Sequence, residues 1–205
     1  LVPGCENDNA AYEDLNPFWY KFTCFTTGTL GFTITPLTGS DDYDWQLFDI
    51  TGHDALDVYT NRSLYVASNW SANPGATGTT SNAGSFTNCA GFDYPNKSKM
   101  PTLIEGHQYL LLVSHFTITN QSGYKLSFAG GSANITDPKI PHLQEARAYC
   151  DGTNVIVKLN KKMRCTSLAA DGSDFTVSDP AFSVIGAVAA GCLSGFDMDS
   201  VTLTL

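Results

Sequence analysis

The sequence predicts an all-β protein made of two β-sandwich units. Only 15% of its 205 residues are charged, whereas Gly, Ser, Thr and Asn are abundant, and the apolar residues come in short runs separated by turn formers. A proline-containing segment at 137–141 separates two series of such runs. The length allows each unit to bury its own core. We therefore expect a first unit at 1–136, a linker at 137–141 and a second unit at 142–205.

Five segments of the first unit have the alternation or the aromatic density of β-strands, and they lie at 18–25, 29–35, 41–52, 108–115 and 123–128. The first two are expected to pair as an antiparallel hairpin across the turn at 26–28. The fourth is almost continuously apolar, which indicates a central strand. The last one alternates and closes the unit.

The pattern weakens between these strands, and residues 69–100 are expected to form a long loop. Small and polar residues dominate from Asn69 to Ala90. Loops of this length inside compact domains often bind ligands, and one interpretation is a ligand-facing loop that carries Trp70, Phe86 and Phe92, with Tyr94 as a further candidate. The interpretation that we favour is a surface excursion that Cys89 fixes to the domain, with its aromatic side chains packed back onto the core.

The second unit has its own strand pattern. Its expected strands lie at 142–150, 155–160, 174–177, 183–188 and 201–205, with a single helical turn at 165–170. Asp151-Gly152 lies between the first two and is a strong signal for a β-hairpin. The last strand ends without a turn or a partner strand, so we expect the sequence to be a mature or excised fragment.

The acidic stretch at 41–52 is the main candidate site. Strand alternation places Trp45 and Leu47 on one face and Asp42 and Asp44 on the other, with Asp41 beside them. Neighbouring carboxylates need water, a basic partner or a hard cation, and oxygen ligands suit Ca²⁺ best. Two interpretations stay open: a calcium-stabilised edge of the sandwich, or a solvated acidic loop that leads into a strand.

Six cysteines favour disulfides in an oxidising compartment, because their spacing suits neither zinc nor a C-x-x-C redox motif. Three precede the linker and three follow it. Two self-contained units would therefore each have an odd cysteine. Either one bridge crosses between the units, or partners lie outside the sequence, or some thiols are free.

Charge and hydropathy exclude several partners. A formal net charge of -9 argues against nucleic acid, which needs clustered Lys and Arg, and an acidic chain gains little from anionic membranes. The basic group at 158–164 has no aromatic platform beside it and is expected to be a solvated strand end. No apolar run approaches the ~20 residues that span a bilayer, so direct membrane insertion is not expected.

The sequence contains none of the motifs that would predict an enzyme. It has no H-E-x-x-H, no G-x-S-x-G and no Gly-rich loop between a strand and a helix, and its four histidines are scattered. Each acidic pair, Asp42 with Asp44 and Asp197 with Asp199, lies on one face of a strand, whereas glycosidase carboxylates usually face each other across a cleft. We therefore expect a non-catalytic protein.

Residues 42–49 (DYDWQLFD), with 123–128 as the closing strand, resemble the bacterial pre-peptidase C-terminal (PPC) domain over residues 15–130. The resemblance implies a jelly-roll or PPC-like β-sandwich associated with calcium. The long tract at 69–90 and the extra cysteines depart from that family. In the second unit, residues 151–163 and 171–177 resemble a bacterial Ig-like domain, and this copy lacks the last strands of the sandwich.

Together with residues 16–24, 101–107 and 122–124, these segments resemble large gliding-motility-associated, type IX-secreted surface proteins of bacteria. The resemblance implies an extracellular module, either a structural spacer or an adhesin, whose partners are other domains of the same protein or a glycan or protein ligand. The alternative function is a carbohydrate-binding accessory domain of a secreted hydrolase, with Trp70 and Tyr94 stacking on sugar rings.

Overall fold

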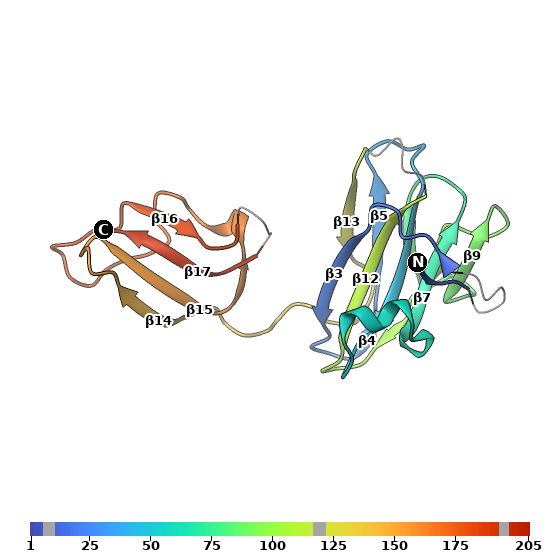
Figure 1. Ribbon diagram of the computed structural model, residues 1–205, viewed down its shortest axis with the longest axis horizontal. Coiled ribbons are helices and arrows are strands. Elements are labelled where there is room, and N and C mark those ends of the chain that lie inside the picture. Colours follow the sequence, from blue (N-terminus) through green and yellow to red (C-terminus); the bar gives the residue numbers. More distant parts are fainter. Residues whose placement is uncertain (6–10, 117–121, 193–196) are drawn as a thin grey trace. The chain divides into compact units, whose positions relative to one another are not determined.

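The computed structural model describes residues 1–5, 11–116, 122–192 and 197–205, and all elements below lie within these ranges. Strands and three short 3-10 helices make up its regular structure, so the predicted all-β class is confirmed for the described part of the chain. The chain divides into two compact units, Leu1–Thr136 (unit 1) and Asp137–Leu205 (unit 2) (Figure 1).

Unit 1 is a β-sandwich of a five-stranded and a four-stranded sheet (Figure 1). The larger sheet has the order β3 (Phe18–Thr23), β12 (Gln108–His115), β6 (Tyr43–Asp49), β7 (Tyr65–Ser71) and β9 (Thr87–Gly91). The smaller sheet has the order β10 (Lys97–Lys99), β8 (Thr77–Thr80), β5 (Phe32–Pro36) and β13 (Tyr124–Phe128). Two short pairs complete the unit: β1 (Val2–Pro3) with β2 (Ala11–Tyr12), and β4 (Gly28–Thr29) with β11 (Thr102–Leu103).

The main core lies between the two sheets of unit 1. Phe32 and Ile34 of β5 meet Trp45 and Leu47 of β6, and all four are fully buried. The Phe32 and Trp45 rings form an edge-to-face pair with centroids 4.8 Å apart. Each such side chain stabilises the fold by roughly 1.5–3 kcal/mol through burial. The predicted inward face of the acidic strand is confirmed.

A second apolar layer covers the outer face of the five-stranded sheet. Phe48 of β6 and Leu112 of β12 pack there against Val2 of the N-terminal segment. The 3-10 helices η1 (Ala55–Tyr59) and η2 (Arg62–Leu64) add Val58 and Leu64 to this layer. Because both faces of β6 are covered, the face expected to carry solvated polar residues is buried.

Two expected features of unit 1 are wrong. The segments at 18–25 and 29–35 do not form a hairpin: β3 pairs with β12 in one sheet, and β5 lies in the other. The expected long loop at 69–100 contains the end of β7 and the whole of β8, β9 and β10. In these strands, hydrogen bonds between polar side chains replace apolar packing, so small and polar residues can form them. A search for alternating apolar residues does not detect such strands. The predicted central position of 108–115 is confirmed, since β12 lies between β3 and β6.

Unit 2 contains one four-stranded antiparallel sheet. Its order is β14 (Leu143–Ala148), β15 (Asn154–Arg164), β17 (Asp197–Thr204) and β16 (Gly186–Ala189). The predicted hairpin is confirmed, with Gly152 at φ +71° in the turn and the Asp151 carboxylate accepting from the Thr153 N–H at 2.9 Å. The helical turn is confirmed as η3 (Cys165–Ser167). The strand expected at 174–177 is absent, and the Asp174 carboxylate there accepts from the backbone of Ala169.

Each unit contains one disulfide and one free thiol. Cys5 is bonded to Cys89 in unit 1, and Cys165 to Cys192 in unit 2. Cys24 is free and buried, whereas Cys150 is free and exposed. The cysteine count allowed a bridge between the units, partners outside the sequence, or free thiols. The structure has the third arrangement, with one free thiol in each unit. No helix in the described ranges is long and apolar enough to cross a membrane.

Candidate functional site

The acidic residues lie where the chain enters β6. Asp42 directly precedes the strand and Asp44 is its second residue. Because β12 and β7 flank β6 on its two sides, the acidic strand is central, and the prediction that it forms an edge of the sandwich is wrong. The register pairs Asp44 with Ser114 of β12. The carboxylates are therefore held by an ordered part of the sheet.

The carboxylate of Asp41 is hydrogen-bonded to Ser122, which is not a partner of Asp42 or Asp44. One oxygen of its carboxylate accepts from the Ser122 backbone N–H at 3.1 Å and also from the Ser122 hydroxyl. The hydroxyl hydrogen bond lowers the pKa of Asp41, and the nearby His115 acts in the same direction. Asp41 is consequently an ionised, satisfied carboxylate that ties the loop before β6 to the segment before β13.

Asp42 lines a hollow of about 380 Å³ at the surface of unit 1. Phe92, His115 and Phe116 form part of its wall, together with Asp41. Phe92 is 75% exposed and Phe116 is 54% exposed. Burial raises the pKa of Asp42 to about 6, since the half-buried carboxylate loses hydration that favours its charged form.

Asp44 lies deeper, in a second hollow of about 160 Å³ that Glu13, Trp70 and Phe116 also line. Its side chain is 2% exposed, and its Oδ1 atom has no hydrogen-bond partner among the described residues. Burial raises the pKa of Asp44 well above its ordinary range, and the charge on Asp42 raises it further. A buried carboxylate with an unsatisfied oxygen is costly in its ionised form.

The negative charges of Asp42 and Asp44 can therefore be neutralised in one of two ways. A proton can neutralise either carboxylate at mildly acidic pH, and a hard cation can neutralise both. Within the described residues no group of three or more His, Cys, Asp or Glu side chains converges as a metal site. Asp42 and Asp44 are the carboxylates that could bind such a cation, and they line two separate hollows that share Phe116.

Three of the aromatic residues considered as ligand-binding candidates, Trp70, Tyr94 and Phe92, have different environments. Trp70 is 6% exposed, and its indole N–H donates to the side-chain oxygen of Gln46 at 3.1 Å. Tyr94 is half-buried, and it lines neither hollow. Its backbone oxygen accepts from the Ser71 hydroxyl. Phe92 alone presents most of its ring to solvent, beside Asp42.

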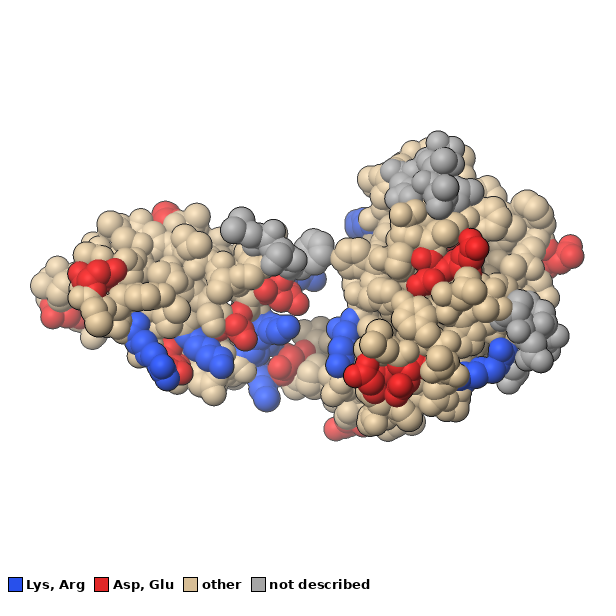
Figure 2. Space-filling view, in the orientation of Figure 1, with Lys and Arg blue, Asp and Glu red and all other residues tan. Residues whose placement is uncertain are grey.

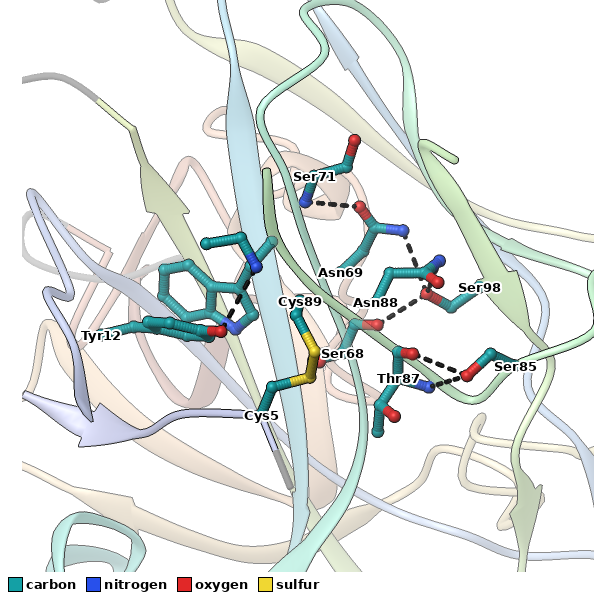
Figure 3. Close-up of a disulfide and its surroundings, with 12 residues drawn as sticks. Cys5, Tyr12, Ser68, Asn69, Ser71, Ser85, Thr87, Asn88, Cys89 and Ser98 are labelled. Carbon is teal, nitrogen blue, oxygen red and sulfur yellow. Dashed lines mark hydrogen bonds between the residues drawn. A yellow bond between two sulfur atoms is a disulfide. The ribbon is translucent and has the colours of Figure 1, made fainter. Parts of the chain in front are cut away.

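A buried polar network organises the strands that replace the expected loop (Figure 3). The side-chain amides of Asn69 and Asn88 both donate to the Ser98 hydroxyl at 3.0 Å, and that hydroxyl donates to the backbone oxygen of Ser68 at 2.6 Å. The Cys5–Cys89 disulfide lies nearby and joins the N-terminal segment to β9 (Figure 3). Because the Asn69 and Asn88 amides and the Ser98 hydroxyl all make hydrogen bonds, we assign this network a structural role. It holds β7, β9 and β10 in their relative positions.

Asp49 and His107 form a second titratable pair, with 2.7 Å between Asp49 Oδ2 and His107 Nδ1. Burial alone would raise the pKa of Asp49, but hydrogen bonds from His107 and Thr51 outweigh it and lower the pKa. The Thr51 hydroxyl donates to Asp49 and accepts from the Gln108 N–H. In a catalytic triad the nucleophile contacts the histidine rather than the aspartate. This pair instead fastens the turn after β6 to the start of β12.

Sequence reasoning missed three residues around the acidic pair, Glu13, Phe116 and Ser122, and it did not connect His115 with that pair. They come from segments far from residue 42 in the chain, and only the sheet register brings them together. Tyr43 pairs with His115 across β6 and β12, and their rings lie 4.7 Å apart. The carboxylates were visible in the sequence, whereas the groups that bury them were not.

Comparison of the chain with protein-family models, with curated proteins and with solved structures finds no match in any of the three.

Proposed function

We propose that this chain is a non-catalytic extracellular module of a bacterial cell-surface or secreted protein, acting as a structural spacer or an adhesin. The observation that carries the proposal is the presence of one disulfide in each unit. Disulfides persist in oxidising compartments and are rare in the cytosol, which favours a location outside it. The remaining argument is the resemblance of residues 42–49, 151–163 and 171–177 to domains of such proteins.

The long loop closed by the Cys5–Cys89 bond fits a module that must stay folded outside the cell. The two cysteines are 84 residues apart in the sequence. In the chain-entropy model, closing a loop of this length destabilises the unfolded state by about 4–5 kcal/mol. A spacer or adhesin that meets no chaperone after secretion benefits from such a restraint.

Calcium at Asp42 and Asp44 forms part of the same proposal. The unpaired Oδ1 of Asp44 and the raised pKa of Asp42 both favour a bound positive species. Calcium is abundant outside cells and takes oxygen ligands in flexible geometry. The ion would stabilise the fold at the start of β6 and would perform no chemistry on a substrate.

The location is tested by labelling intact cells of the native host. An antibody raised against unit 1 should stain unpermeabilised cells or detect the chain in the culture medium. Material purified from either fraction should contain both disulfides by mass spectrometry of peptides. Staining that appears only after permeabilisation, with all six cysteines reduced, would overturn the proposal.

A second candidate function, carbohydrate binding, rests on the exposed Phe92 ring beside the carboxylates Asp41 and Asp42. Aromatic faces stack on sugar rings, and carboxylates accept hydrogen bonds from sugar hydroxyls. The buried Trp70 is excluded from this role by its position. Screening the chain on a glycan array, with Phe92→Ala as the matched control, separates the two functions. Binding that Phe92→Ala abolishes would favour the accessory-domain function.

A further inference from the structure

The open edge of the sheet in unit 2 has a sequence that is complementary to itself. Among the described residues β14 pairs with β15 alone, and all six of its residues are exposed. It contains neither Pro nor Gly. Of the features that protect edge strands against pairing, it has charged side chains and a register shift between Leu143 and Glu145, and the regular register from Glu145 to Ala148 leaves that part of the strand able to pair. Strand β14 therefore presents a pairing surface, and its side chains indicate what would pair with it.

The backbone groups that point away from β15 follow from the register. Residues in β14 and β15 pair so that Ala146 faces Val157 and Arg147 faces Ile156. The Tyr149 N–H donates to the backbone oxygen of Asn154 at 2.9 Å. Because hydrogen-bonded pairs alternate along an antiparallel ladder, Arg147 also directs its N–H and C=O toward β15. Ala146 consequently directs its N–H and C=O outward.

The charges of β14 are arranged symmetrically about Ala146. Glu145 precedes it and Arg147 follows it, and the two side chains form an ion pair along the strand. If a second β14 pairs antiparallel about Ala146, Glu145 of each strand lies opposite Arg147 of the other. Ala146 then forms the central hydrogen-bonded pair, and the charged residues form non-hydrogen-bonded pairs, in which side chains lie closest.

The apolar surface beside Ala146 and the net charge of unit 2 are both compatible with this pairing. Ala146 lines an apolar groove of about 580 Å³ together with Val157 and Leu203, so pairing at the edge would extend an apolar surface across two copies. Unit 2 contains six Lys and Arg and eight Asp and Glu, whereas most of the chain's charge of -9 lies in unit 1. Figure 2 shows basic side chains of unit 2 gathered where β14 and β15 lie, with acidic ones among them.

We propose that unit 2 binds a second copy of this chain through antiparallel pairing of β14 with β14, centred on Ala146. The pairing joins two four-stranded sheets into one continuous sheet and places Glu145 and Arg147 in two reciprocal ion pairs. The interface is isologous, as expected of a two-fold symmetric dimer. It does not involve the acidic site of unit 1.

Charge variants test the pairing by sedimentation of the full chain over a series of concentrations. All variants contain Cys150→Ser, because the exposed Cys150 thiol could otherwise link two chains. The parent should dimerise. Glu145→Lys and Arg147→Glu should each weaken self-association by roughly tenfold, since each places like charges opposite one another twice. A mixture of the two variants should form a heterodimer, because every facing pair then has opposite charges.

A cross-link provides a second measurement. Central hydrogen-bonded residues lie ~5.5 Å apart between Cα atoms, which a disulfide can span. Ala146→Cys in the Cys150→Ser background should therefore form a dimer on mild oxidation. The matched control is Val188→Cys on the opposite edge strand β16, where the side chain is 71% exposed. A parent that stays monomeric, equal cross-linking at both positions, or self-association unchanged by both charge variants would overturn the proposal.

Discussion

The indole N–H of Trp70 donates to the side-chain oxygen of Gln46 across 3.1 Å, inside the layer that covers the outer face of the larger sheet. The amide of Gln46 in turn donates to the backbone oxygen of Pro3 at 3.0 Å. Gln46 is fully buried. Gln46 and Trp70, one of the candidates for ligand binding, thus join the N-terminal segment to β6 and β7.

Trp70 should matter for stability, whereas Phe92 should not. Trp70→Ala removes a large buried side chain and leaves Gln46 without a hydrogen-bond donor, so we expect the free energy of unfolding to fall by about 3–5 kcal/mol. Phe92→Ala removes an exposed ring and should change it by less than about 0.5 kcal/mol. Urea unfolding of both variants measures the difference. Similar values for the two would contradict the assignment of Trp70 to the core.

The buried network around Ser98 predicts a cost for removing one amide. Asn88→Ala removes the amide that donates to the backbone oxygen of Lys97 at 3.2 Å, whereas the Ser98 hydroxyl loses one donor and keeps the Asn69 amide. Unsatisfied buried polar groups cost about 1–3 kcal/mol, and the unfolding free energy should fall by that amount. Asn82→Ala, at an exposed turn, is the control and should be near neutral. Equal effects of the two substitutions would show that the network adds nothing to stability.

The cysteines should react in a fixed order. Without denaturant, an alkylating reagent should modify Cys150 and spare the buried Cys24. Unfolding without reductant should expose Cys24 and bring the total to two, and reduction should bring it to six. Mass spectrometry counts the modifications at each step. A third modified cysteine before reduction would contradict the disulfide pairing.

The acidic pair predicts an unusual pH dependence in the absence of divalent cations. Burial raises the pKa of Asp42 to about 6, whereas an unfolded aspartate titrates near ~3.9. Between these values the folded state binds more protons than the unfolded state, so stability falls as pH rises through this window. The full shift corresponds to about 3 kcal/mol, and solvent screening of the half-buried carboxylate reduces the expected loss for Asp42 to on the order of 2 kcal/mol. Asp44, with its pKa raised further, continues the fall to higher pH.

Urea midpoints measured in chelator at intervals between pH 4 and pH 8 test this dependence. Asp42→Asn should flatten the lower part of the curve. Asp41→Asn serves as the control, because the pKa of Asp41 is lowered and its contribution is lost only below this window. A parent whose stability rises with pH throughout the interval would contradict the assigned direction.

The sequence predicted what depends on local pattern. Alternation around Trp45 and Leu47, the apolar run of β12 and the Asp151-Gly152 turn all reflect the backbone period and turn chemistry of short segments, and all three are found in the structure. The class and the positions of most strands follow from such signals.

What the sequence could not predict depends on long-range register. Strand β6 proved to be central because the distant strand β12 pairs on one side of it, while the next strand along the chain, β7, pairs on the other. The strands β8 and β9 escaped detection because Thr, Asn and Gly build them and side-chain hydrogen bonds satisfy their buried polar groups. Of the candidate site, the sequence identified the carboxylates of Asp42 and Asp44 but not the burial that changes their pKa values.

The central claim is that a positive species neutralises Asp42 and Asp44 and that calcium performs this role outside the cell. Thermal melting at neutral pH in calcium and in chelator tests it most directly. A ligand that binds only the folded state at 100 times its dissociation constant adds about 2.7 kcal/mol, which corresponds to several degrees in Tm. The account predicts a higher Tm in calcium, and no difference for the variant with both Asp42→Asn and Asp44→Asn. Equal melting of the parent chain in calcium and in chelator would contradict it.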